Sequence, residues 1–108
     1  MTVTFSPRAW YEYTSWQLED KKYLKRINTL IKDIERNGNS GIGKPEPLRN
    51  WDGYWSRRID ETNRLVYKLT GEAENKALFI AQCKTHYEGL ATKEFPHFTH
   101  KGISLFTY

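Results

Sequence analysis

Apolar residues recur at helical spacing in the first third of the chain. The residues of this apolar stripe are Leu24, Ile27, Leu30, Ile31 and Ile34. They fall on one face of a helix that the spacing predicts over residues 21–36, with Asp20 as its cap. A shorter helix is expected over residues 7–18, because Ser6 suits an N-cap and Pro7 a first helical position. The two together predict a helical hairpin.

Short runs of β-prone residues flank this hairpin. One precedes it at residues 2–5, and three follow it at residues 53–59, 64–69 and 77–84. The segments between the later runs are rich in turn-forming residues, which favours an antiparallel meander. A further short strand is expected around residues 48–51. The predicted fold class is α+β, with a short N-terminal strand and the helical hairpin packed on one face of an antiparallel sheet.

The composition favours one small domain with an anionic partner. The chain has 108 residues, a formal charge of +4 and a pI of about 9.2. A basic balance favours nucleic acid, an acidic protein or anionic lipid as a partner. Aromatic residues make up 15% of the chain, which is more than one small core needs. Some of them are therefore expected on a working surface.

The sequence also sets expectations about the cellular setting. No apolar run approaches the ~18 residues of a membrane span. The single cysteine, Cys83, cannot form an internal disulfide and is not part of a metal-binding cluster. We expect a protein of the reducing cytoplasm, with no membrane as a partner.

Cleavage of RNA without a metal needs three chemical groups. A base takes the proton from the ribose 2′-OH, a cation holds the charge that grows on the phosphate, and an acid protonates the leaving 5′-oxygen. The sequence has no H-E-x-x-H motif, no paired aspartates and no Cys/His spacing typical of a metal site. Neither a metal nor another cofactor is therefore expected.

Glu46 is the candidate base. It lies between Pro45 and Pro47, which stiffen its backbone and favour an extended conformation. Its carboxylate could therefore be held at the edge of a strand. A surface glutamate at the entry to the sheet is the simpler interpretation, and the residues alone favour it.

The candidate cations lie on two neighbouring strands. Arg57 and Arg58 close one strand and Arg64 opens the next. Arginine carries a fixed charge on a fork that matches phosphate oxygens. Because neighbours in a strand face opposite ways, Arg57 and Arg58 cannot both point at one site. The simpler interpretation is a solvated sheet face with ion pairs to Asp60 and Glu61.

His86 and Tyr87 follow the last expected strand. A histidine that titrates near neutral pH suits the work of a general acid. A tyrosine beside it could stack on a base or donate a hydrogen bond to a phosphate. An ordinary pair of residues at the end of a strand would look the same in the sequence.

Four ordered blocks carry a specific resemblance to a known family. They are residues 43–48 (GKPEPL), 53–59 (GYWSRRI), 63–67 (NRLVY) and 83–87 (CKTHY). From about residue 3 to residue 87 the chain resembles the YoeB-type toxins of the RelE/ParE superfamily. That resemblance implies a helical hairpin on an antiparallel sheet. It also implies metal-independent cleavage of mRNA in the ribosomal decoding site, through 2′-OH attack and a 2′,3′-cyclic phosphate, and neutralisation by a cognate antitoxin.

The resemblance assigns roles to individual residues of this sequence. Glu46 matches the family's general-base glutamate, and Arg64 matches the arginine that stabilises the phosphate charge. His86 matches the general acid, and Tyr87 matches the tyrosine that helps to place the substrate. Three further positions are expected to bind RNA: Lys44, Arg49 and Arg58.

Related toxins usually stop at the His-Tyr pair, whereas this chain continues beyond it. The resemblance therefore divides the chain into a RelE/YoeB-like toxin domain, residues 1–87, and a C-terminal extension, residues 88–108. The implied partners are the 70S ribosome with its mRNA and a YefM/Phd-type antitoxin, which would also bring operator DNA. Related toxins tend to pair, which leaves a homodimer open.

Three other kinds of function fit parts of the sequence. A protein that only binds its antitoxin in a repressor complex would need no catalytic residues. Toxicity against a DNA topoisomerase, on a related fold, is disfavoured by the set of Glu46, Arg64 and His86. Plain RNA binding would use the same basic and aromatic surface. Growth arrest that depends on His86 or Arg64 would separate the nuclease from a protein that only binds.

Overall fold

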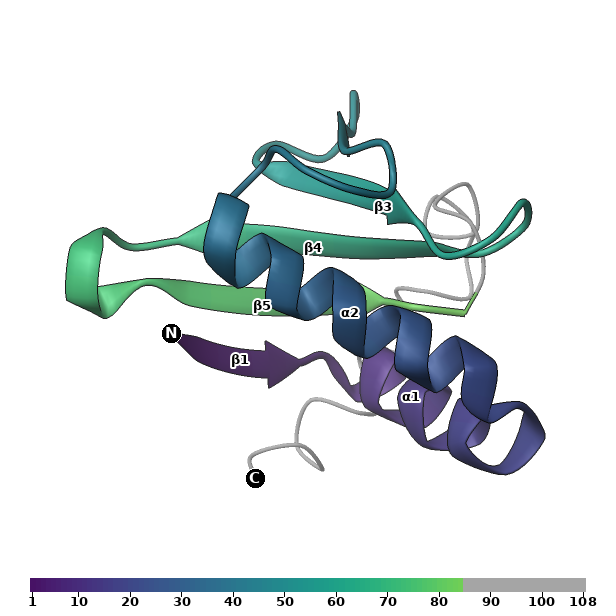
Figure 1. Ribbon diagram of the computed structural model, residues 1–108. Coiled ribbons are helices and arrows are strands. Elements are labelled where there is room, and N and C mark those ends of the chain that lie inside the picture. Colours follow the sequence, from purple (N-terminus) through teal and green to yellow (C-terminus); the bar gives the residue numbers. More distant parts are fainter. Residues whose placement is uncertain (85–108) are drawn as a thin grey trace.

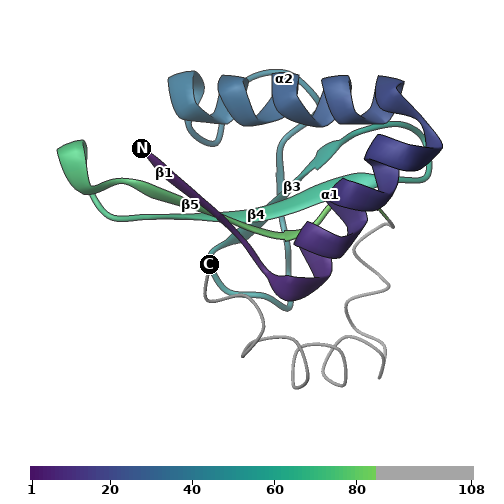
Figure 2. The same ribbon diagram turned by 90° about the horizontal axis from the view of Figure 1, so that it is seen from below.

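The structure, a computed structural model, describes residues 1–84. Its elements in chain order are β1 (Thr2–Phe5), α1 (Pro7–Glu19), α2 (Lys21–Asn37), β2 (Glu46–Pro47), β3 (Tyr54–Arg58), β4 (Arg64–Thr70), the 3-10 helix η1 (Ala73–Asn75) and β5 (Ala77–Gln82). Both long helices lie on one face of a five-stranded sheet (Figures 1 and 2). The predicted α+β class is confirmed, while the extension after residue 87 lies outside the described residues.

The sheet is mixed, with the strand order β1-β5-β4-β3-β2. The predicted meander is confirmed, since β3 pairs antiparallel with β4 and β4 pairs antiparallel with β5. The first strand, β1, adds to the outer edge of β5 in the parallel direction. At the other edge, the two-residue strand β2 pairs antiparallel with β3.

The prediction of a short strand around residues 48–51 is wrong in the position of the strand. The strand is β2, residues 46–47, and the chain turns directly after it. The amide of Leu48 donates to the carbonyl of Tyr54 at 2.9 Å, and the amide of Tyr54 donates to the carbonyl of Trp51 at 3.0 Å. These bonds close a tight connection to β3, so the apolar Leu48 marks a buried turn residue instead of a strand.

The two helices begin and end at residues whose side chains or backbone satisfy the exposed backbone groups. The hydroxyl of Ser6 accepts from the amide of Ala9 at 2.9 Å, and the carboxylate of Asp20 accepts from the amide of Lys22 at 3.0 Å. At the end of α2, the amide of Gly38 donates to the carbonyl of Ile34. Within residues 1–84, no helix has both the length and the apolar composition that crossing a bilayer requires.

The main core lies between the helices and the sheet. The buried residues of this core are Ala9, Trp16, Ile27, Leu30, Ile34, Ile59, Leu65, Tyr67, Leu78, Ile80 and Cys83. Three positions of the predicted stripe on α2 belong to it, and the other two, Leu24 and Ile31, pack partly buried against it. A smaller cluster of Leu48, Val66 and Ala81 lies apart from this core, with three aromatic side chains packed against it. Much of the aromatic excess is therefore used in packing.

Helix α1 also holds the chain where β5 ends. Trp16 donates from its indole nitrogen to the carbonyl of Cys83 at 2.9 Å, and the carboxylate of Glu12 accepts from the amide of Cys83 at 2.7 Å. Burial raises the pKa of Glu12. Hydrogen bonds from Arg8 and from the Cys83 amide favour its charged form and lower the pKa, but burial has the larger effect. Lys84 forms an ion pair with Glu19 on the same helix. The chain therefore leaves β5 in a direction that α1 determines.

Candidate active site

Two of the predicted site residues meet at the sheet edge formed by β2 and β3. Glu46 opens β2, where its neighbour across the pair is Ser56 of β3. Arg64 opens β4, where it is directly opposite Arg58 of β3. The guanidinium of Arg64 reaches across β3 to the carboxylate of Glu46, at 2.9 Å between Nη2 and Oε1. Antiparallel pairing thus joins residues that are 18 positions apart in the sequence.

Three neighbours fix the guanidinium of Arg64. Besides the bond to Glu46, its Nε donates to the hydroxyl of Ser56 at 2.9 Å, and its Nη2 donates to the carbonyl of Lys44 at 3.4 Å. Ser56 is fully buried, so this hydroxyl is a fixed acceptor beneath the arginine. Among the described residues, no acceptor pairs with Nη1, which leaves two N–H donors for a further anion.

The two partners of this ion pair differ in exposure. The side chain of Arg64 is 11% exposed, whereas that of Glu46 is 61% exposed. An arginine that is largely buried loses part of its hydration, which strengthens its attraction for a bound anion. An exposed carboxylate can exchange this arginine for another partner at little cost. The arrangement suits a site where an incoming phosphate competes for Arg64.

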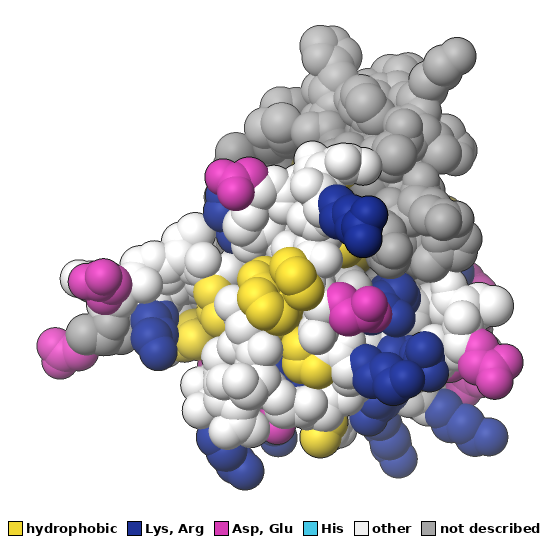
Figure 3. All heavy atoms as spheres, turned by 90° about the horizontal axis from the view of Figure 1, so that it is seen from above, with side chains coloured by type: hydrophobic (Ala, Val, Ile, Leu, Met, Phe, Trp, Pro, Cys, Tyr) yellow, Lys and Arg dark blue, Asp and Glu magenta, His cyan; other side chains and the backbone are white. Residues whose placement is uncertain are grey.

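The predicted RNA-binding residues lie around this pair in different ways. Arg58 is exposed and adjoins Arg64 across the strands. Lys44 is exposed, has a backbone φ of 51°, and contributes its carbonyl to Arg64. Arg49 is exposed in the turn between β2 and β3. Figure 3, seen from the side of this edge, shows basic side chains gathered around an acidic one beside a hydrophobic patch.

The predicted acid and its neighbour, His86 and Tyr87, lie outside the described residues. Their roles remain predictions from the resemblance. Within residues 1–84, no group of three or more His, Cys, Asp or Glu side chains is arranged to hold a metal ion.

The sequence interpretation of Arg57 is wrong, and it overlooked Ser56. Arg57 does not lie on a solvated face with Asp60 or Glu61, because its side chain is fully buried and forms an ion pair with Asp33 of α2. The alternation of strand residues was the available signal. If Arg58 faces solvent, Ser56 must share its face and Arg57 must point towards the helices.

The comparisons with known proteins agree with this architecture. The model of one family, the YoeB-like toxin of bacterial type II toxin–antitoxin systems, matches residues 5–87. A curated relative, Toxin YoeB of Streptomyces coelicolor, is 50% identical over 88 residues, which cover 81% of this chain and 100% of that protein.

Solved structures resemble the chain over the same extent. A YoeB/ParE toxin from Agrobacterium tumefaciens matches with a TM-score of 0.76 at 39% identity, covering 81% of this chain and 100% of that one. Two Staphylococcus aureus structures each cover 81% of this chain and 98% of theirs. A YoeB dimer matches with a TM-score of 0.72 at 48% identity, and a heterotetrameric YoeB–YefM toxin–antitoxin complex with 0.71 at 49%.

A helical hairpin on a mixed five-stranded sheet, as in the solved YoeB structures, defines a small protein of the RelE-like class. Within that class, this chain belongs to the YoeB-like toxins of bacterial type II toxin–antitoxin systems. It is accordingly the toxin component of such a system.

Proposed function

We propose that this toxin is a metal-independent endoribonuclease that cleaves mRNA in the decoding site of the ribosome. The observation that carries the proposal is the pair of Glu46 and Arg64, joined at 2.9 Å at an accessible sheet edge. A base and a phosphate-binding cation must lie this close together to act on one ribose and its 3′-phosphate. The exposed Arg58 beside Arg64 adds a second positive charge.

In this mechanism Glu46 takes the proton from the ribose 2′-OH. The 2′-oxygen then attacks the adjacent phosphorus, and the bond from phosphorus to the 5′-oxygen of the next nucleotide breaks. His86 gives a proton to that leaving oxygen. The products are a 2′,3′-cyclic phosphate and a 5′-hydroxyl. Because the Glu46 side chain is 61% exposed, its reactivity comes from its position beside the substrate and not from burial.

The basic residues hold the phosphate during this reaction. Arg64 carries the charge that grows on the non-bridging oxygens, using the donors that remain on Nη1. Arg58, Lys44 and Arg49 contact the RNA backbone on either side, and Tyr87 helps to place the substrate. An open edge orders a flexible RNA poorly. The ribosome supplies that order by holding the message in the decoding site.

Solved structures of relatives support a proposal about the partners. The Staphylococcus aureus YoeB structures include a complex with YefM and a dimer. We propose that this toxin is neutralised in the cytoplasm by a cognate YefM/Phd-type antitoxin that also binds operator DNA, and that a homodimer is its free form. Size-exclusion chromatography with light scattering, with and without the antitoxin, tests both assemblies. A toxin that stays monomeric at all concentrations contradicts the homodimer.

Mapping of cleavage sites on a translated message tests the nuclease proposal. Wild type is expected to cut at codon-spaced positions and to leave 5′-hydroxyl ends, while His86→Ala and Glu46→Ala are strongly weakened. Cleavage that leaves 5′-phosphate ends rules out the mechanism. A folded wild-type protein that makes no cuts, but still binds its antitoxin, supports a protein that only binds.

A further inference from the structure

The buried side chain of Arg57 makes many hydrogen bonds, but it has no role in the proposed mechanism. Arg57 is fully buried, and all five N–H donors of its guanidinium have acceptors. Its Nε donates to the hydroxyl of Tyr67 at 3.3 Å, and one donor of Nη1 bonds to the carboxylate of Asp33. The guanidinium pairing lowers the pKa of Asp33, which keeps that carboxyl charged.

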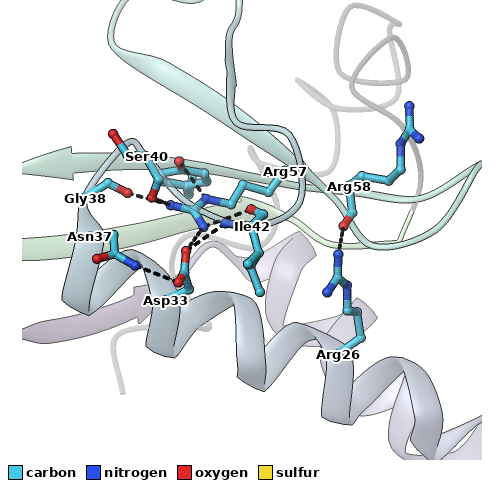
Figure 4. A network of polar contacts seen from close by, with 9 residues as sticks. Arg26, Asp33, Asn37, Gly38, Ser40, Ile42, Arg57 and Arg58 are labelled. Atoms are coloured by element: carbon cyan, nitrogen blue, oxygen red, sulfur yellow. Dashed lines mark hydrogen bonds and ion pairs between the residues drawn. The ribbon is translucent and has the colours of Figure 1, made fainter.

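The remaining donors bind the loop between α2 and β2. Nη2 donates to the carbonyls of Gly38 at 2.7 Å and Ser40 at 2.8 Å, and Nη1 donates to the carbonyl of Ile42 at 3.0 Å (Figure 4). These carbonyls belong to alternate residues, so the loop curves around one charged group. Asp33 closes the ring, because its carboxylate accepts from the amide of Ile42 at 3.1 Å.

The sequence of the loop fits this close approach. Gly41 has a φ of +129°, and a Cβ at that position would collide with the carboxylate of Asp33. Gly43 has a φ of +81°, and a Cβ there would lie 2.9 Å from Cδ2 of Leu30. Side chains at these two positions would push the loop away from the guanidinium.

The loop leads directly into the candidate active site. The carbonyl of Gly43 accepts from the amide of Arg58 at 2.6 Å, the carbonyl of Lys44 accepts from Arg64, and Glu46 follows two residues later. Strand β2 has only two residues, so its pairing with β3 alone gives Glu46 little support. On β3, Ser56 supports Arg64 from one face of the sheet while Arg57 holds the loop from the other.

We infer that Arg57 is a positioning residue, which holds the loop of residues 38–45 so that the Glu46 carboxylate stays in register with the Arg64 guanidinium. The inference deepens the proposed function, and its kinetic part rests on it. A misplacement of about 1 Å can cost on the order of 100-fold in rate when the geometry of a catalytic group matters. Loosening the loop therefore lowers kcat, while Arg49 and Arg58, the exposed RNA-binding side chains outside the loop, keep KM nearly constant.

Arg57→Lys is the first variant, because it keeps a positive charge for Asp33 but loses the planar fork that bridges the loop carbonyls. Tyr67→Phe is the matched control. It removes the hydroxyl that accepts from Nε of Arg57 but leaves all the hydrogen bonds between the guanidinium and the loop carbonyls in place. We expect kcat for ribosome-dependent cleavage to fall at least ~10-fold in Arg57→Lys with KM changed less than ~3-fold, and Tyr67→Phe to stay within ~3-fold of wild type.

Amide hydrogen exchange provides a readout that does not depend on activity. In Arg57→Lys, exchange should accelerate at the amide of Ile42, which bonds to Asp33, and at the amide of Arg58, which bonds to the loop. It should not accelerate at the amides of β4 and β5.

If Arg57→Lys does not fold, Asp33→Asn takes its place with the same expectations. If wild type cleaves no RNA, the proposed function fails, and exchange alone decides the positioning role. Unchanged exchange at both amides, or equal losses of kcat in Arg57→Lys and Tyr67→Phe, would overturn the inference.

Discussion

At the scale of single residues, the candidate site combines a fixed arginine with an accessible carboxylate. Arg64 rests on the buried hydroxyl of Ser56 and on the carbonyl of Lys44, so most of its contacts belong to the scaffold. Glu46 contributes one bond to it from a side chain that is mostly in solvent. Ion pairs with such exposure contribute roughly 0–1 kcal/mol to stability. The carboxylate therefore contributes little to folding, which is consistent with the catalytic role that we propose for it.

Glu46→Gln separates these two roles. The amide keeps the shape of the side chain and an acceptor for Arg64 but cannot remove a proton. We expect ribosome-dependent cleavage to fall on the order of 10²–10⁴-fold, the range for loss of a general base. The free energy of unfolding in urea should change by less than ~1 kcal/mol. Cleavage within a few-fold of wild type would show that Glu46 is not the base.

Ser56→Ala tests the support beneath Arg64. Ser56 is fully buried, and its hydroxyl is the acceptor for Nε of Arg64 at 2.9 Å. Removing it leaves a donor of a charged group without its partner, which costs about 1–3 kcal/mol. We expect a matching loss in urea unfolding and a drop in cleavage of at least ~10-fold as the guanidinium shifts. A variant with full activity would mean that Lys44 and Glu46 suffice to hold Arg64.

At the scale of elements, the turn between β3 and β4 determines how the two arginine-bearing strand ends meet. The carboxylate of Asp60 accepts from the amides of Thr62 and Asn63, at 2.8 and 2.6 Å. Burial raises the pKa of this carboxyl, but hydrogen bonds from Tyr23, Asn63 and Thr62 outweigh that effect and lower the pKa to about 2. Tyr23 lies on α2, so the same carboxylate also ties the turn to a helix.

This shift has a defined pH dependence. The folded-state pKa of Asp60 lies below its ordinary value of 3.8, so its contribution to stability is complete above about pH 4 and is lost as the pH falls towards 2. Asp60→Asn should therefore be less stable than wild type at pH 7, and the difference should shrink between pH 4 and pH 2. Urea unfolding of both proteins across that range measures it. A constant difference at all pH values would contradict the assignment to Asp60.

The sequence predicts those elements whose signals are local. Both helices begin at the capping residues expected for them, because a side-chain cap and an apolar period depend only on neighbouring residues. The meander follows from its short turns. The parallel pairing of β1 with β5 has no such signal, since a four-residue strand alternates in the same way in either direction. Leu48 misleads because buried turn residues and strand residues are equally apolar.

The candidate site also has a part that the sequence predicts and a part that it does not. The resemblance in ordered blocks directs attention to Glu46 and Arg64, and the structure brings these two together. No block explains why Arg57 is buried, because its partners come from the end of α2 and from backbone carbonyls of a glycine-containing loop. A charged residue is buried only where such partners converge. That convergence is a property of the fold and not of the neighbouring residues.

At the scale of the whole molecule, the helices hold two separate segments that lead to the expected catalytic residues. Helix α2, through Asp33, anchors the loop that enters β2 with Glu46. Helix α1, through Glu12 and Trp16, holds Cys83 at the end of β5, three residues before His86. The packing of the helical hairpin on the sheet is therefore coupled to the geometry of both segments. A change in α2 should therefore disturb Glu46 more than His86, and a change in α1 should disturb His86 more than Glu46.

The same view predicts the effect of removing residues 88–108. The family model matches residues 5–87, so residues 88–108 lie beyond the part of the chain that it covers. We expect a chain that ends at Tyr87 to unfold within ~1 kcal/mol of the full chain, a shift in Tm of under ~8 °C, and to cleave mRNA on the ribosome within a few-fold. His86→Ala in both lengths is the control, and both should be strongly weakened. If the shortened chain loses stability, the extension is part of the domain. If it folds but no longer cleaves mRNA, the extension contributes to the site or to ribosome binding, and the toxin domain does not end at residue 87.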